Sequence, residues 1–342
     1  MIGQHQVTIK DIAKRLKISV STVSRALRGS ADISDDTRKL VLSVAQEMQY
    51  SPNPVALSLR DKKTKVIGVI VQEIANNYCS AVIAGIEDIA FKMGYNVLIC
   101  QSHEKLDLER LNTRMLASRR VDGLLITISN ESSQVTHLQE MIDRGIPVVM
   151  FDRVSDELQT HKVVVDDYKG AFDATSHLIE QGYKKIAHLT ISKDLSITQH
   201  RLNGYLDALK AHKIPINKDW IIYCDFGEEN MKNEVRTLMH SKKRPNAIFS
   251  SVERLSMASV KVLKELNLSV PGDVALAGFA DNPLCRYLNP ALTAVSQPTF
   301  SIGQNATELL IELIESKKAE DKYTTIKLKT TLDIQASSLR KA

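Results

Sequence analysis

The sequence predicts an all-α helix-turn-helix headpiece at the N-terminus, followed by an α/β body of two doubly wound lobes. The first observation is length, because 342 residues exceed one ordinary domain. Capped helical patterns fill residues 1–50, which is typical of a small helical domain. From Val66 onward, continuous apolar runs alternate with helical patterns, as buried parallel strands joined by helices do.

Three short helices are expected in the headpiece. Thr8 can cap the first, with Asp11 accepting a hydrogen bond in return. Ser19 can cap the second, Gly29 can end it, and Ser34 can cap the third. The expected core residues are Ile9, Ile12, Ala13 and Leu16, then Val23, Ala26 and Leu27, then Leu40, Val41, Val44, Ala45 and Met48. A tight turn between the first two helices makes the pattern a helix-turn-helix.

The positive charge of the chain is concentrated at this end. Residues 1–65 contain 12 Lys and Arg and 6 Asp and Glu, a net charge of +6. The remaining 277 residues contain 33 bases and 34 acids, a net charge of −1. A basic module of this kind points to a polyanionic partner, with a merely solvated surface as the alternative.

The second helix has an outward face of hydroxyls and arginines. Its outward residues are Val20, Ser21, Thr22, Ser24, Arg25 and Arg28. In a recognition helix such side chains meet base edges and phosphates, and Arg25 could bind O6 and N7 of guanine together. Small hydroxyl residues are poor helix formers, which argues against a merely solvated helix. We expect binding to double-stranded DNA, with the caps Thr8 and Ser19 among the contacting residues.

Residues 51–65 are expected to form a hinge helix. Two prolines flank Asn53, so a helix can start only near that residue. Val55, Ala56 and Leu59 would share one face of a helix so short that it is marginal alone in water. A plain flexible linker is the alternative, although a flexible linker does not require three apolar residues on one helical face.

The body, residues 66–342, contains two successive series of alternating strands and helices. The first series holds the apolar runs KVIGVIV, YNVLICQS, VDGLLITI and IPVVMFD. The alternation restarts with KVVVDD and continues with KIAHLTI, WIIYCDF, AIFSSV and VALAGFAD. Two doubly wound lobes follow from this pattern, and ligands of such sheets bind beyond the strand C-termini.

Several other classes of protein are disfavoured. The sequence contains no run of about 18 apolar residues, so no membrane span is expected. The polar N-terminus lacks the apolar segment of a secretory signal. The four cysteines lack CxxC spacing and the nine histidines are scattered, so we expect a cytoplasmic protein with no metal and no cofactor. No GxGxxG, GxxxxGK[ST] or GxSxG motif occurs, and no base accompanies Cys79, so an enzyme is not expected.

The segment VTIKDIAKRLKISVSTVSRAL closely resembles the headpiece of the LacI/GalR family of bacterial transcription regulators. In the body, SRRVDGLLI, GIPVVMFDR, VVVDDYKGAF, HLIEQGYKKIAHL, RLNGY, VPGDVALAGFAD and LTAVSQPTFSIGQNATELL resemble family segments in family order. The resemblance implies a fold like that of periplasmic sugar-binding proteins, with an effector cleft between two lobes and three crossovers. We place the crossovers near residues 163–166, 295–298 and 328. The expected N-lobe is residues 66–164 with 298–326, and the C-lobe is 165–297 with 327–342.

The same resemblance implies roles for individual residues. Hinge helices of two subunits would pair in the minor groove, where Leu59 would wedge a base step and Asn53 would contact the backbone. A homodimer fits, because one headpiece reads only half of a palindromic operator. In the cleft, Asp152 and Arg201 would bind an effector, and their groups suit contacts to sugar hydroxyls or an anion. Tyr78 could stack on a sugar face or a base.

Three departures from the family pattern bear on these expectations. Lys17 stands where the family usually has Gly, which costs about 1 kcal/mol if the turn is left-handed. Val252 and Ala280 replace polar residues of the cleft, although Asp281 remains. Sugar hydroxyls buried against them would lose hydrogen bonds worth about 1–3 kcal/mol each. Three alternatives stay open: a less polar effector, a different binding pose, or a partner protein.

The sequence therefore predicts a DNA-binding transcription regulator. We expect a dimeric repressor of carbohydrate-related genes, controlled by a small, sugar-like effector in the interlobe cleft and without contact to a membrane. One alternative is a regulator whose co-effector is a partner protein. The other is a solute-binding protein of transport, against which the basic headpiece argues. The operator, the effector and the direction of control do not follow from the sequence.

Overall fold

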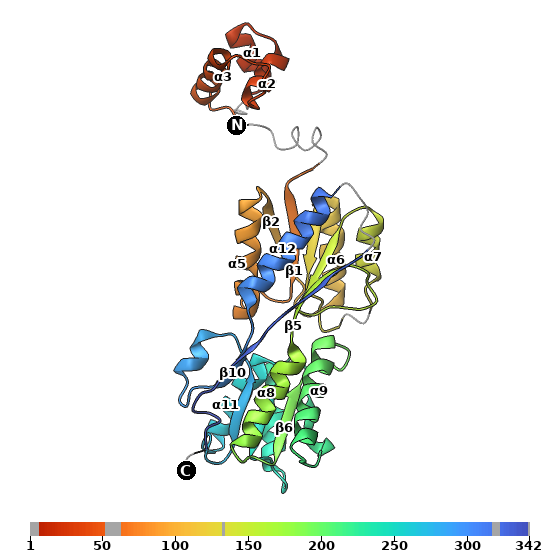
Figure 1. The fold of residues 1–342 in the computed structure, drawn as a ribbon, viewed down its shortest axis with the longest axis vertical. Coiled ribbons are helices and arrows are strands. Elements are labelled where there is room, and N and C mark those ends of the chain that lie inside the picture. Colours follow the sequence, from red (N-terminus) through yellow and green to blue (C-terminus); the bar gives the residue numbers. More distant parts are fainter. Residues whose placement is uncertain (1–6, 52–62, 132–133, 317–321, 341–342) are drawn as a thin grey trace. The chain divides into compact units, whose positions relative to one another are not determined.

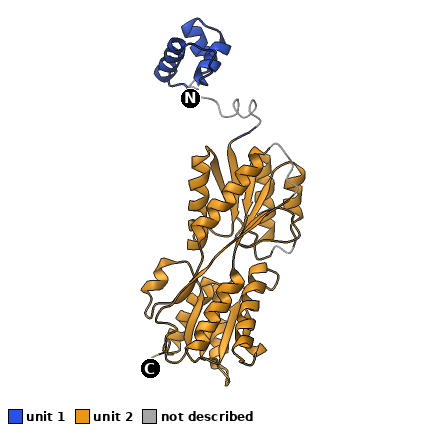
Figure 2. Cartoon of the chain, viewed as in Figure 1, with its two compact units in different colours: residues 1–64 blue, residues 65–342 orange. Residues whose placement is uncertain are grey.

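The computed structural model describes residues 7–51, 63–131, 134–316 and 322–340. It divides into two compact units, Met1–Thr64 and Lys65–Ala342, shown in different colours in Figure 2. Asn53, Ala56 and Leu59 lie outside the described residues, so the hinge helix stays a prediction. In the described part of the chain, no helix is both long and apolar enough to cross a bilayer.

The first unit contains the three predicted helices. They are α1 (Ile9–Leu16), α2 (Val20–Leu27) and α3 (Asp35–Glu47). The predicted caps are confirmed: the Thr8 backbone N–H donates to Asp11 Oδ2 at 2.9 Å, and Ser19 Oγ accepts from the Thr22 N–H at 3.0 Å. Gly29 follows α2 with a φ of +71°, where a residue without Cβ is favoured.

Two details of this unit were open or wrong in the sequence analysis. The turn between α1 and α2 is left-handed at Lys17, with a φ of 52°, so the expected backbone cost applies. Leu40, expected in the core, is 53% exposed, whereas its neighbour Val41 is fully buried. Helical spacing predicts a broad apolar stripe on α3, and α1 and α2 pack against only part of that stripe.

The second unit is built on two six-stranded sheets. The N-lobe sheet has the order β11-β5-β4-β3-β1-β2 and is parallel throughout. Its strands are β1 (Val66–Val71), β2 (Asn96–Gln101), β3 (Gly123–Ile126), β4 (Val148–Phe151), β5 (His161–Val165) and β11 (Thr325–Leu328). The C-lobe sheet has the order β12-β10-β9-β8-β6-β7, with β12 antiparallel to β10. Its strands are β6 (Ile186–Thr190), β7 (Ile221–Tyr223), β8 (Ala247–Ser250), β9 (Ala275–Phe279), β10 (Thr293–Ser296) and β12 (Thr331–Asp333).

Helices cover both sheets, as Figure 1 shows. The N-lobe helices are α5 (Asn77–Lys92), α6 (Leu106–Ser118), α7 (Thr136–Asp143) and α12 (Thr299–Glu315), and those of the C-lobe are α8 (Asp167–Glu180), α9 (Ser196–Ala211), α10 (Glu228–His240) and α11 (Glu253–Glu265). Helices α5 and α12 touch backbone to backbone, because a Cβ on Gly303 would lie 2.1 Å from the Val82 carbonyl oxygen. Glycine is needed at that crossing.

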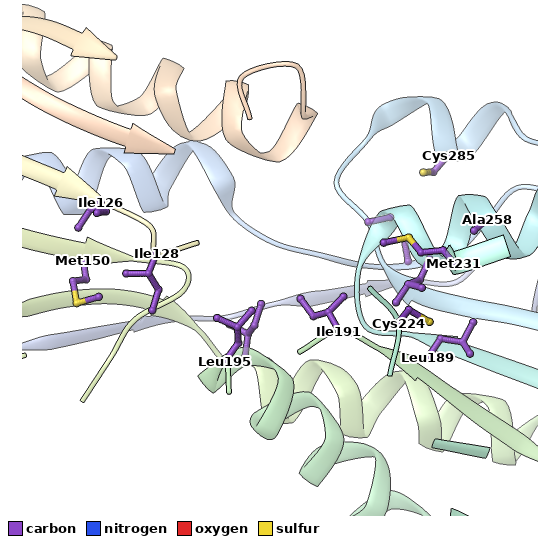
Figure 3. Packing of buried hydrophobic residues seen from close by; sticks show 14 of the residues in the cluster. Ile126, Ile128, Met150, Leu189, Ile191, Leu195, Cys224, Met231, Ala258 and Cys285 are labelled. Carbon is purple, nitrogen blue, oxygen red and sulfur yellow. The ribbon is translucent and has the colours of Figure 1, made fainter. Parts of the chain in front are cut away.

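The chain passes between the two sheets three times, after β5, β10 and β11. Strand β5, with which the alternation of the sequence restarts, therefore pairs in the N-lobe sheet between β4 and β11. One apolar cluster also spans both lobes. Figure 3 shows Ile126, Ile128 and Met150 of the N-lobe in this cluster with Ile191 and Leu195 of the C-lobe.

Candidate functional site

The outward face of α2 is the candidate DNA-contacting surface of the first unit. Helix α2 contains no acidic residue in its first turn, and its buried residues Val23 and Ala26 turn the polar side outward. Of the predicted contact residues, Thr8, Ser19, Val20, Ser21, Arg25 and Arg28 are exposed, whereas Thr22 and Ser24 are half-buried. The face thus offers hydroxyls and guanidinium groups, which suit phosphates and base edges.

The two arginines of this face differ in their freedom. Arg28 Nε donates to the Ser24 carbonyl oxygen at 3.0 Å, which holds that side chain along the helix. The guanidinium group of Arg25 makes no hydrogen bond or ion pair within the described residues. A guanidinium group without a protein partner keeps all five donors for a ligand, so Arg25 is the better candidate for a base contact.

In the second unit, a pocket of about 270 Å³ lies between the lobes. Its lining includes all four side chains proposed for the effector: Tyr78, Asp152, Arg201 and Asp281. Tyr78 is on α5 after β1, Asp152 follows β4, Arg201 is on α9 after β6, and Asp281 follows β9. Carboxyl ends of parallel strands meet at one sheet edge, which explains why residues far apart in sequence converge here.

Arg201 is held rigidly in the pocket wall. The side chain is only 3% exposed, and its Nε and Nη2 lie 2.7 and 2.6 Å from Asp167 Oδ1. It also donates to the Ser251 carbonyl and, at 3.3 Å, to Gln297 Oε1, and it lies 3.7 Å from the centre of the Phe279 ring. Burial raises the pKa of Asp167, and the Arg201 charge offsets part of that rise. Arg201 is thus preorganised rather than mobile.

Asp152 occupies a strained backbone position beside the pocket. Its φ is +59°, in the left-handed region that costs a non-glycine residue about 1 kcal/mol or more. Burial raises the pKa of its carboxyl group, and the charges of Arg153 and Arg201 lower it only in part. A local ion pair of Asp152 with Arg153 was the alternative to a binding role. Arg153 instead pairs with Glu104, with Nη1 and Oε2 2.7 Å apart.

Asp281 and Tyr78 face the same cavity. Asp281 accepts from the backbone N–H and from Nε2 of Gln297, at 2.6 and 2.7 Å. Burial nevertheless raises the pKa of Asp281 to about 6. The Tyr78 hydroxyl is shielded from solvent and has no acceptor in hydrogen-bonding geometry. Burial raises the Tyr78 pKa well above its usual value, and the nearby Asp152 and Asp281 carboxylates raise it further.

The two apolar departures also lie in this pocket. Val252 and Ala280 both line it, and neither can donate or accept with its side chain. The carboxylate of Glu253, next to Val252, accepts from the backbone N–H groups of Asp281 and Asn282, at 3.3 and 3.2 Å, so it is already engaged within the chain. The C-lobe side of the wall therefore has an apolar stretch at Val252 and Ala280 next to its polar residues.

Some pocket residues were not predicted from the sequence. Glu104, Gln297, Phe226 and Arg254 line the pocket, and Asp167 lies behind it against Arg201. Arg254 of the C-lobe forms an ion pair with Glu73 of the N-lobe, across the cleft. The sequence indicated these residues only weakly. Most of them follow an apolar run directly, but the neighbouring residues do not show which side chains they contact.

The described residues offer no group of three His, Cys, Asp or Glu that could hold a metal ion. Cys79 lines the pocket, but burial raises the pKa of its thiol to about 11, so little nucleophilic thiolate exists at neutral pH. Its Sγ lies 3.4 Å from Gln72 Oε1, a side-chain amide that cannot act as a base.

Comparison with known proteins agrees with this architecture. Residues 8–53 match the family described as "Bacterial regulatory proteins, lacI family", and residues 64–334 match "Periplasmic binding proteins and sugar binding domain of LacI family". The chain is 32% identical over 313 residues to the HTH-type transcriptional repressor PurR of Aliivibrio salmonicida, covering 92% of this chain and 94% of that one. It is 32% identical over 330 residues to the ribose operon repressor of Haemophilus influenzae, covering 96% and 98%.

Among solved structures, the lac repressor dimer bound to operator and the anti-inducer ONPF superposes with a TM-score of 0.84. That comparison covers 98% of this chain and 99% of the other at 22% identity, so it shows a shared fold. The family matches and the two relatives together extend over both units of the molecule. The chain belongs to the LacI family: it is a DNA-binding transcriptional repressor, not an enzyme, and its second unit is a ligand-binding domain of the periplasmic-binding-protein type.

Proposed function

We propose that this repressor binds a palindromic operator as a homodimer and responds to a small-molecule effector held between the lobes. Residues 1–50 would bind DNA, 51–65 would form the hinge, and 66–342 would bind the effector and dimerise. The protein would act in the cytoplasm, where operator DNA is accessible. Genes of carbohydrate metabolism are its proposed targets, since one relative is a ribose operon repressor.

The free guanidinium group of Arg25 supports the DNA-binding part of this proposal. Arg25 lies on the exposed face of α2, in the last turn of that helix, and a guanidinium group there can reach the edge of a guanine. The hydroxyls of Ser21 and Ser19 lie 2.7 Å apart at the exposed start of α2, where the helix N-terminus favours a phosphate. Base reading by arginine and phosphate anchoring by hydroxyls would together define a half-site.

Exposed apolar side chains support the dimer. Phe91 is 84% exposed and Met93 and Leu111 are more than half exposed in the N-lobe, while Tyr287 is 83% exposed in the C-lobe. Large apolar groups left in water by a folded unit mark interaction surfaces. A dimer that covers them would also place two headpieces on the two halves of one operator.

The convergence of Tyr78, Asp152, Arg201 and Asp281 on one cavity carries the effector part of the proposal. An enclosed, mostly preformed site with a few fixed polar groups is what a small ligand requires. The cavity volume of about 270 Å³ lies near the lower end of such sites, about 300–1,000 Å³, which favours a compact ligand.

Selection of bound DNA from a random pool tests the proposal most directly. We expect the full chain to select an inverted repeat, and a bound sugar-like compound to change the selected yield. A single, asymmetric half-site would contradict the dimer. If DNA is selected but no small molecule alters DNA binding, the result favours a regulator whose co-effector is a partner protein. The apolar stretch at Val252 and Ala280 would then contact a ligand other than a sugar.

A further inference from the structure

The pocket between the lobes contains more acidic than basic side chains. Its lining carboxylates belong to Glu73, Glu104, Asp152, Glu253 and Asp281, and its guanidinium groups to Arg153, Arg201 and Arg254. Asp167, bonded to Arg201 and 3% exposed, adds a sixth carboxylate behind the lining residues. With every group ionised, the site carries three negative charges in excess.

Each guanidinium group is already paired with a carboxylate of the chain. The pairs are Arg153 with Glu104 at 2.7 Å, Arg201 with Asp167 at 2.6 Å, and Arg254 with Glu73. An anionic ligand would have to displace one of these carboxylates or add its charge to the existing excess. Both options are costly in a partly dehydrated site, so an anion is disfavoured.

The carboxylates outside these pairs are held by neutral donors. Glu253 accepts from two backbone N–H groups at the start of α11, where the helix N-terminus favours negative charge. Asp281 accepts from Gln297, and Asp152 accepts weakly from Thr127 Oγ1 at 3.4 Å. Asp152 and Asp281 are therefore two pocket carboxylates that form no close ion pair with a basic side chain within the described residues, although the Arg201 charge acts on both.

Tyr78 gives an independent reason to expect a donor in the ligand. Tyr78 lines the cavity, and its hydroxyl oxygen is shielded from solvent and has no hydrogen-bond partner in good geometry, although the nearby Asp152 carboxylate can accept from it. A buried polar atom left unpaired costs free energy, and the lone pairs of this oxygen can accept from a ligand donor. A tyrosine ring also attracts a cation placed over its face.

We propose that the effector carries a positively charged amino group on a compact, sugar-sized body, and that Asp152, Asp281 and Tyr78 receive this group. The proposal rests on the proposed function, in which this pocket is the effector site. An ammonium group has three donors, enough for two carboxylates and one hydroxyl. Val252 and Ala280 would face an apolar part of the same ligand, where they lose nothing by lacking polar atoms.

Matched pairs of sugars test this by calorimetry on the full chain at pH 7. The probes are glucosamine and galactosamine, each against the parent hexose, which lacks the amine, and the N-acetyl derivative, which removes the charge and adds an acetyl group. We expect each amine that binds to do so at least about tenfold more tightly than both neutral counterparts, the effect of one added ion pair. Equal or tighter binding of a neutral counterpart, or no binding of either amine, would overturn the proposal.

Variants locate the amino group. Asp281→Asn and Asp152→Asn should each reduce affinity for the amine at least about tenfold, and should reduce affinity for the parent hexose by a smaller factor. Asp194→Asn removes the same charge from the C-lobe surface and serves as the matched control. Circular dichroism confirms folding of each variant. Unchanged amine affinity in both pocket variants would place the cation elsewhere and refute the assignment.

Operator binding separates this inference from the proposed function. If a neutral sugar binds in the pocket and changes operator affinity, the proposed function stands and the inference falls. If glucosamine or galactosamine binds through Asp281 but leaves operator affinity unchanged, the charge preference stands and ligand control of DNA binding falls. Loss of the operator effect in Asp281→Asn, together with amine binding in the parent chain, supports both.

Discussion

Replacing Asp281 by asparagine is expected to stabilise the second unit above pH 6. Burial holds the pKa of Asp281 at about 6 in the folded chain, against 3.8 for the free group. Near pH 3 the carboxyl group is protonated in both states, so it adds no pH-dependent cost. Between pH 4 and 6 the unfolded chain releases its proton while the folded chain retains it, so the stability of the parent chain falls as pH rises.

The size of the effect follows from the shift in pKa. A rise of about two units corresponds to about 3 kcal/mol, all of it present above pH 6. Asparagine carries no charge and avoids this cost, and its Oδ1 can still accept from the Gln297 backbone N–H. Its amide group would face Gln297 Nε2 donor to donor, and losing that hydrogen bond costs about 1 kcal/mol. The net gain is about 2 kcal/mol.

Urea unfolding at a series of pH values from 4 to 8 measures this directly. The parent chain and Asp281→Asn should have similar stability at pH 4 and diverge by pH 7, with the variant more stable. Asp194→Asn, on the surface of the same lobe, is the control for loss of one negative charge. A variant less stable than the parent at pH 8, or two parallel profiles, would refute the reasoning.

Four further predictions concern the headpiece and hinge. Operator affinity should fall with log salt at a slope of about −7 if the dimer makes about 8 phosphate contacts, and a flat response would contradict the basic headpiece as the binding surface. Arg25→Ala should relax the selected consensus by about 1–3 kcal/mol per half-site, whereas Arg119→Ala, exposed on the body, should leave it unchanged. Lys17→Gly should stabilise the first unit by up to about 1 kcal/mol in calorimetry, because the left-handed φ of 52° no longer strains a side chain. Leu59→Ala should reduce operator bending in circular-permutation gels, and an undiminished bend would make the linker only a tether.

The features that the sequence predicted well depend on interactions a few residues long. The Thr8–Asp11 contact, the Ser19 cap and the glycine that follows α2 all form within one helical turn, so local residue types specify them. Apolar runs likewise indicated the strands, whereas resemblance to the family pointed to Asp152 and Arg201, which line one pocket together with Tyr78 and Asp281. The prediction is wrong at Leu40, because helical periodicity shows that α3 has an apolar stripe but not how much of that stripe is buried.

By itself, the sequence determined the helix-turn-helix headpiece and the doubly wound class of the body. Only the tertiary structure decided which carboxylate partners each arginine. Arg153 pairs with Glu104 rather than with its neighbour Asp152, and Arg201 pairs with Asp167. The physical reason is distance in space: Coulomb attraction and strand pairing act between groups that the crossovers bring close together. The spacing of residues along the chain does not specify which groups those are.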